Sequence, residues 1–310
     1  MNQEYLYLLC KNFLEGYNNF NDYEEIKCAL EDVAHANYIF HNCEMPVKIS
    51  FIEIDALGCS AKVGSEGLIK FNTLRIETLK NLKIDCFDDG HLDRIYNFYN
   101  NYDATVPHSK YEKCLYDFMV KYIELNAQVY FSQMGSYKNL KFELLETLLH
   151  ENKHVFQNQV IEAIDEGAAV DKFEAIDVFT VIFQRVFYML NKYNIEFDYE
   201  RKNYIFPIEF DARYYAMVEM NNVKNLYFST DNDFKQAIVN SYIVPQEFDP
   251  IEVSNQIYND YLRAYELYKN NLNNDYIHAH DFIIKNKENI IEELIYRYKT
   301  MLDIVKDNQI

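Results

Sequence analysis

Apolar residues recur at the three- and four-residue spacing of an amphipathic helix along most of the chain. The stretches with this spacing are residues 3–15, 23–41, 109–131, 138–159, 168–193, 209–221, 251–271 and 286–306. Asn21 or Asp22 precedes the second stretch as a candidate N-cap, and the acidic residues that follow suit the positive end of a helix dipole. The pattern therefore predicts a mostly helical protein.

The two-residue alternation of β-strands is convincing only in residues 47–72. The segment "VKISFIEI" alternates after Pro46, "CSAKV" and "GLIKFN" follow, and "GSEG" lies between these two as a turn. The fold class we expect is therefore α+β and predominantly helical, with a small sheet that contains antiparallel strands.

Few residues mark domain boundaries, since the chain has only 7 Gly and 5 Pro and no repeat stands out. We expect an N-terminal helical region over residues 1–46, a central domain over 47–225 and a C-terminal helical region over 226–310, with one continuous domain as the alternative. Apolar stripes with tyrosine edges on the C-terminal helices are typical of core packing or of a dimer face. A homo-oligomer through these helices is therefore one candidate assembly.

The acidic composition narrows the classes of partner. The chain has 49 Asp and Glu against 30 Lys and Arg, and a formal charge of -19 repels nucleic-acid phosphates and anionic lipid surfaces. We expect no nucleic-acid partner and no membrane association. The N-terminus lacks the features of a signal peptide, and six widely spaced cysteines without a CxxC pair are typical of reduced thiols. The expected location is cytoplasmic.

The segment "ETLLHENKHVFQNQ", residues 146–159, places His150 and His154 four positions apart, with Glu151 directly after the first histidine. At about 100° per residue, the two histidines fall about 40° apart on one side of a helix, opposite an apolar stripe. Two imidazoles at this spacing can bind one Zn²⁺ ion at about 2.0–2.1 Å. Glu151 cannot share their direction, but it can take a proton from a metal-bound water as general base.

A catalytic zinc site needs a third protein ligand, and two later acidic clusters could supply it. The candidates are Glu162, Asp165, Glu166, Glu209 and Asp211. The first three lie in "VIEAIDEGAAVD", whose small residues suit a turn, and the last two follow Pro207, which suits the first turn of a new helix. The residues alone leave Glu209, Asp211 and Glu166 open.

The motif HENKH followed by P-x-E-x-D-A resembles the gluzincin-type zinc metallopeptidases, particularly small intracellular bacterial and phage members with an HExxH helix and a later E-x-x-A helix. In these enzymes the glutamate three residues before the alanine is the third ligand, which implies Glu209 here. The resemblance further implies that Asp211 holds the outer nitrogen of a histidine in the correct tautomer. It implies a zincin-like domain with Zn²⁺ as cofactor and an intracellular protein or peptide as substrate.

The resemblance also covers "EGLIKFN", which looks like the edge strand to which a peptide adds as an extra strand in such enzymes. It implies substrate-binding roles for Leu68, Ile69, Lys70 and Phe71.

Two features depart from the compact members of this family. His154 and Glu209 are 55 positions apart, so the predicted helix at 168–193 would be an insertion between the ligands. The oxyanion donor is also undefined, with Tyr204, Tyr214 and Tyr215 as candidates. The alternative function is that of a non-catalytic helical interaction protein with a degenerate zincin-like core.

Overall fold

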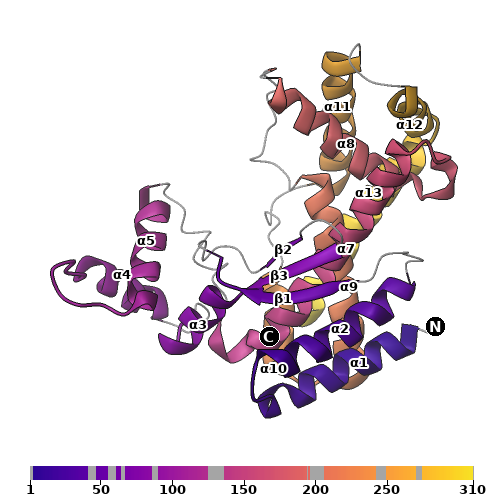
Figure 1. Cartoon of the computed structure of the whole chain (residues 1–310). Helices are drawn as coiled ribbons and strands as arrows, with labels where there is room; N and C mark the ends of the chain where they lie inside the picture. Colours follow the sequence, from indigo (N-terminus) through magenta and orange to yellow (C-terminus); the bar gives the residue numbers. More distant parts are fainter. Residues whose placement is uncertain are drawn as a thin grey trace. The chain divides into compact units, whose positions relative to one another are not determined.

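The computed structural model describes residues 3–40, 47–54, 61–63, 67–85, 90–124, 136–193, 195, 206–241, 249–269 and 274–309 (Figure 1). Within these ranges the chain is mostly helical and contains a small three-stranded sheet. The predominantly helical α+β architecture predicted from the sequence is therefore confirmed. None of the described helices is long and apolar enough to cross a membrane.

The helices of the first part of the chain are α1 (Gln3–Gly16), η1 (Tyr17–Asn19), α2 (Tyr23–Phe40), α3 (Thr73–Asn81), α4 (His91–Asn100) and α5 (Lys110–Glu124). Those of the second part are η3 (Tyr137–Asn139), α7 (Leu140–Asp165), η4 (Val170–Lys172), α8 (Ala175–Lys192), α9 (Pro207–Tyr227), α10 (Asn232–Ser241), α11 (Pro250–Tyr268), α12 (Asn274–Lys285) and α13 (Lys287–Asn308). Each stretch predicted to be helical overlaps one of these helices. The short helices α3, α4, α10 and α12 were not predicted, because few turns give a weak periodic signal.

Of the two predicted N-cap candidates, Asp22 is the one that caps α2. Its side chain accepts a hydrogen bond from the backbone N–H of Glu25 (3.0 Å), and the Glu25 carboxylate accepts one from the backbone N–H of Asn21 (2.7 Å). These two bonds satisfy the N–H of Glu25 in the first turn, which has no partner inside the helix, and the N–H of Asn21 just before the helix.

The sheet consists of β1 (Lys48–Ile52), β2 (Ala61–Val63) and β3 (Leu68–Asn72), in the order β1-β3-β2. Strand β3 is parallel to β1 and antiparallel to β2. The antiparallel pair was expected, but the prediction that Leu68, Ile69, Lys70 and Phe71 form an edge strand is wrong. Because β3 is the central strand, its backbone is already hydrogen-bonded to neighbours on both sides, and alternation alone does not reveal strand order.

The chain forms two compact units, and two of the boundaries between them fall inside α7 and α9. The first unit comprises Met1–Asn152, Met220–Ser241 and Ile310, and the second comprises Lys153–Glu219 and Tyr242–Gln309. The predicted regions 1–46, 47–225 and 226–310 divide the chain at other positions.

In the first unit, aromatic rings and a partly buried ion pair join helices that are distant in the sequence. The Phe142 ring of α7 stacks on Phe234 of α10, with 4.4 Å between the ring centroids. The Nε atom of Arg75 in α3 lies 2.7 Å from the Oε1 atom of Glu143 in α7. The start of α7 is thereby fixed to both neighbouring helices.

In the second unit, α8 packs against α11, α12 and α13 (Figure 1). Phe179 and Phe183 of α8 contact the ring of Tyr261 in α11 edge-on, at centroid distances of 5.4 and 5.7 Å, and all three side chains are buried. On α13, Leu294 and Tyr298 are fully buried. The apolar stripes of the C-terminal helices therefore form core, while a homo-oligomer stays a prediction.

Candidate metal centre

Helix α7 carries both histidines of the HExxH motif and continues further than its predicted end at residue 159. Val160 and Ile164 are buried and extend the apolar face. The helix ends in a turn in which Gly167 has a φ of +78°. The N–H of Gly167 donates to Ile164 O (3.0 Å) and that of Ala168 donates to Ala163 O (2.8 Å), the hydrogen-bond pattern of a Schellman motif.

The continuation of α7 removes the nearer acids from the candidate ligands. At about 1.5 Å per residue, Glu162 lies about 12 Å along the helix axis from His154, and Glu166 lies beyond the last residue of α7. Asp165 accepts a hydrogen bond from the Tyr276 hydroxyl (2.5 Å) and lies 3.5 Å from the Arg185 guanidinium. These acids would come close to the histidines only if a turn followed residue 159, as the sequence allowed.

Helix α9 brings Glu209 to the histidines. Pro207 is its first residue, where the fixed φ suits the helix and no N–H is needed, and Glu209 follows in the first turn. One donor atom each from His150, His154 and Glu209 lies within 4.8 Å of the other two. The structure thus brings together the three residues predicted as ligands.

The spacing of one pair of these atoms matches that of a zinc site. Around a tetrahedral ion with ligands at about 2.0–2.1 Å, two ligand atoms lie about 3.3–3.4 Å apart. The Nε2 atom of His154 lies 3.3 Å from the Oε1 atom of Glu209. The side chain of Glu209 is 46% exposed and that of His154 is 16% exposed, so solvent reaches this part of the group. The donors, two imidazoles and a carboxylate, are a ligand set found in catalytic zinc sites.

Glu151 follows His150 on α7 and is half-buried. Its position next to the first histidine is the one that the motif requires of a general base. Its role as a base stays a prediction.

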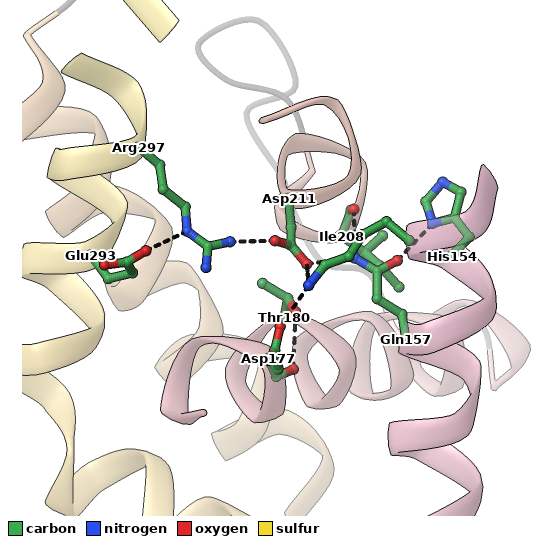
Figure 2. Close-up of polar contacts among 9 residues, drawn as sticks. His154, Gln157, Asp177, Thr180, Ile208, Asp211, Glu293 and Arg297 are labelled. Carbon is green, nitrogen blue, oxygen red and sulfur yellow. Dashed lines mark hydrogen bonds and ion pairs between the residues drawn. The ribbon is translucent and has the colours of Figure 1, made fainter. Parts of the chain in front are cut away.

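Gln157 connects His154 to Asp211 (Figure 2). The Oε1 atom of Gln157 lies 2.6 Å from the Nδ1 atom of His154, and its Nε2 atom donates to Asp211 Oδ2 (2.7 Å) and to the carbonyl oxygen of Ile208 (3.1 Å). Asp211 was predicted to hold a histidine's outer nitrogen, and it reaches His154 through this carboxamide. The sequence did not reveal the role of Gln157, although its place one turn after His154 put it on the histidine face.

Asp211 lies in a buried cluster of charges drawn from four helices (Figure 2). Its Oδ1 atom accepts a hydrogen bond from Arg297 of α13, and its Oδ2 atom lies 3.4 Å from the Lys153 ammonium of α7. Lys153 also donates to Asp177 of α8 (2.9 Å), and Arg297 donates to Glu293 (2.7 Å). Each buried charge therefore has a partner of opposite sign.

The electrostatics of this cluster keep Asp211 ionised. Burial alone would raise the pKa of Asp211, but the charges of Lys153 and Arg297 and the hydrogen bond from Gln157 hold that pKa below its ordinary value. Burial likewise would lower the pKa of Lys153, but Asp211 and Asp177 raise it. The cluster is thus an ion-pair network that supports the first turns of α9.

Two of the candidate oxyanion donors lie in the described part of the chain. The ring of Tyr214 lies 5.0 Å from the Arg297 guanidinium, and burial raises the pKa of Tyr214 to about 12, so its phenol carries its proton at neutral pH. Tyr215 is buried, and Tyr204 lies outside the described residues. The oxyanion donor stays a prediction.

No protein-family model matches the chain, and comparisons with curated proteins and with solved structures likewise find no match. The case for a function therefore depends on the residues and geometry of the candidate metal centre.

Proposed function

We propose that the chain is a zinc-dependent peptidase with a zincin-like core, which hydrolyses peptide bonds in a protein or peptide. The observation that carries the proposal is the grouping of His150, His154 and Glu209, with one donor atom from each within 4.8 Å of the others. Two of these residues belong to an HExxH sequence on a continuous helix, and the third comes from a separate helix. The meeting of candidate ligands from two separate helices favours a true metal site over a chance match of the motif.

His150, His154 and Glu209 would hold the ion through two imidazole nitrogens and one carboxylate oxygen. When bound with three protein ligands, Zn²⁺ supplies Lewis acidity, which polarises a substrate carbonyl and lowers the pKa of water at the fourth position. Glu151 takes the proton from the attacking water and then donates it to the nitrogen of the departing amine. The reaction consumes one water and leaves a new carboxylate and a new amine.

The experiment compares the wild-type chain with Glu151→Gln in zinc content and in hydrolysis of a proteome-derived peptide mixture, with new N-termini identified by mass spectrometry. The matched control is Glu162→Gln, an exposed acid further along α7. We expect all three proteins to bind one zinc ion. Glu151→Gln should lose hydrolysis by about 10²–10⁴-fold, the usual contribution of a general base.

The possible results separate the parts of the proposal. A wild-type chain that binds no zinc contradicts the proposed function. Hydrolysis by Glu151→Gln at the wild-type rate contradicts the role of Glu151. Zinc binding without cleavage of any peptide favours the alternative, a non-catalytic interaction protein.

A further inference from the structure

Gln157 is fully buried, and its carboxamide has a partner at each end. The nitrogen end faces Asp211 Oδ2 (2.7 Å) and Ile208 O (3.1 Å), and the oxygen end faces His154 Nδ1 (2.6 Å) (Figure 2). A side-chain amide could be turned by 180°, so its orientation must follow from its partners.

The Ile208 carbonyl decides the orientation of this amide. A backbone carbonyl can only accept a hydrogen bond, so the Gln157 atom that lies 3.1 Å from it is the NH₂ group. The Oε1 atom therefore faces His154 and can only accept. The hydrogen between Oε1 and Nδ1 consequently belongs to the histidine, in either protonation state of Asp211.

The tautomer of His154 follows from this hydrogen bond. In a neutral imidazole, one nitrogen carries the hydrogen and the other has a lone pair. With the hydrogen on Nδ1, the lone pair lies on Nε2, which is the atom 3.3 Å from Glu209 Oε1. The nitrogen that points toward the candidate ligand group is the one that can bind a cation.

We propose that Gln157 is a positioning residue, which fixes the ring orientation and the Nδ1–H tautomer of His154 so that Nε2 is available for the metal. The inference rests on the proposed function, because it assumes that His154 binds zinc. Asp211 holds the carboxamide in place and is itself held by Arg297 and Lys153. A hydrogen bond from Gln157 to Asp211 thus links the histidine to the buried charge cluster.

The first measurement uses the zinc-free wild-type chain and needs no variant. Long-range ¹H–¹⁵N spectra of ¹⁵N-histidine-labelled protein, recorded at about pH 8, distinguish the two tautomers of a neutral imidazole. The signal of His154 is assigned by its absence in His154→Ala. We expect the Nδ1–H tautomer, and an Nε2–H tautomer would overturn the proposal.

The second measurement compares the zinc affinity of Gln157→Leu with that of Gln159→Leu, using competition with a chelator. Gln159 is the matched control because it lies on the same helix and its buried Nε2 has no hydrogen-bond partner among the described residues. We expect Gln157→Leu to bind zinc about 10–100-fold more weakly, as is usual when the partner of a ligating histidine is removed, and to show a mixture of His154 tautomers. Gln159→Leu should retain the wild-type affinity and tautomer.

The outcomes separate this inference from the proposed function. Equal zinc affinities of Gln157→Leu and Gln159→Leu, with zinc bound by the wild type, overturn the inference alone. Failure of the wild type to bind zinc overturns the proposed function and, with it, the inference. If Gln157→Leu does not fold, the wild-type tautomer still decides the question.

Discussion

The Nε2 atom of His154 lies 3.3 Å from the Oε1 atom of Glu209, although 55 positions separate the two residues in the sequence. The intervening chain includes the whole of α8. The predicted insertion between the two ligand helices is thus a helix whose buried residues belong to the core of the second unit. It does not prevent the two side chains from meeting.

Replacement of Glu209 tests the assignment of the third ligand. Glu209→Ala should weaken zinc binding by about 100-fold or more, since changes in residues that only support a ligand already cost about 10–100-fold. The matched control is Glu166→Ala, which removes an exposed acid beyond the end of α7 and should leave affinity unchanged. Chelator competition measures both. The assignment is wrong if the control loses its zinc and Glu209→Ala does not.

Removal of Arg297 tests the buried charge cluster. Arg297→Met removes the charged partner of one oxygen of the buried Asp211 carboxylate, which should lower the free energy of unfolding by about 3–5 kcal/mol. Lys306→Ala on the same helix removes an exposed ion pair with Asp303 and should change the free energy by less than about 1 kcal/mol. Urea unfolding measures the difference. Equal effects of the two variants would show that the buried network contributes little.

His280 is expected to make the second unit sensitive to acid. Burial lowers its pKa below 6.5. Its Nδ1 atom lies 2.8 Å from the Tyr261 hydroxyl. An unprotonated Nδ1 can accept a hydrogen bond from this hydroxyl, and a protonated one cannot. The histidine in the unfolded chain binds a proton more readily than His280 does in the folded protein. The stabilising contribution of neutral His280 is therefore complete above about pH 6.5. It is lost as the pH falls toward the pKa of the folded state.

The measurement is the thermal midpoint between about pH 7.5 and 5.5, a window set by the ordinary pKa of histidine. His280→Gln should reduce the fall in midpoint over this window. His278→Gln, an exposed neighbour on the same helix, should show the wild-type fall. An unchanged pH dependence in His280→Gln would exclude His280 as its source.

Asn72 joins the end of β3 to the start of α3, and its replacement tests that junction in the first unit. Its buried side-chain oxygen accepts hydrogen bonds from the backbone N–H groups of Leu74, Arg75 and Ile54. Asn72→Ala should destabilise the protein by about 1–2 kcal/mol, near the upper end for loss of a helix cap. Asn81→Ala, at the exposed end of α3, should stay within about 0.5 kcal/mol of wild type in urea unfolding.

The sequence predicted the long helices well because apolar spacing persists over several turns. It also predicted the start of α9, since Pro207 is favourable at a first helical position and unfavourable later. The end of α7 was placed too early because the small residues of "VIEAIDEGAAVD" suggested a turn. Gly167, with its positive φ, marks the actual end.

The pattern of apolar and polar residues could not predict contacts between distant segments. Gln157 and Asp211 are 54 positions apart, and no spacing rule pairs them. Lys153 and Arg297 are of residue types that are mostly exposed, and they are buried here because carboxylates on other helices neutralise them. The order of three strands is likewise set by tertiary packing, which explains the error over β3.

We propose that three residues from two helices bind one zinc ion. The decisive measurement is diffraction from zinc-loaded crystals of the full chain, recorded on both sides of the zinc absorption edge. We expect one anomalous peak about 2.0–2.2 Å from a nitrogen of His150, from Nε2 of His154 and from a carboxylate oxygen of Glu209. A peak at other residues, or none at this group, would contradict the proposal.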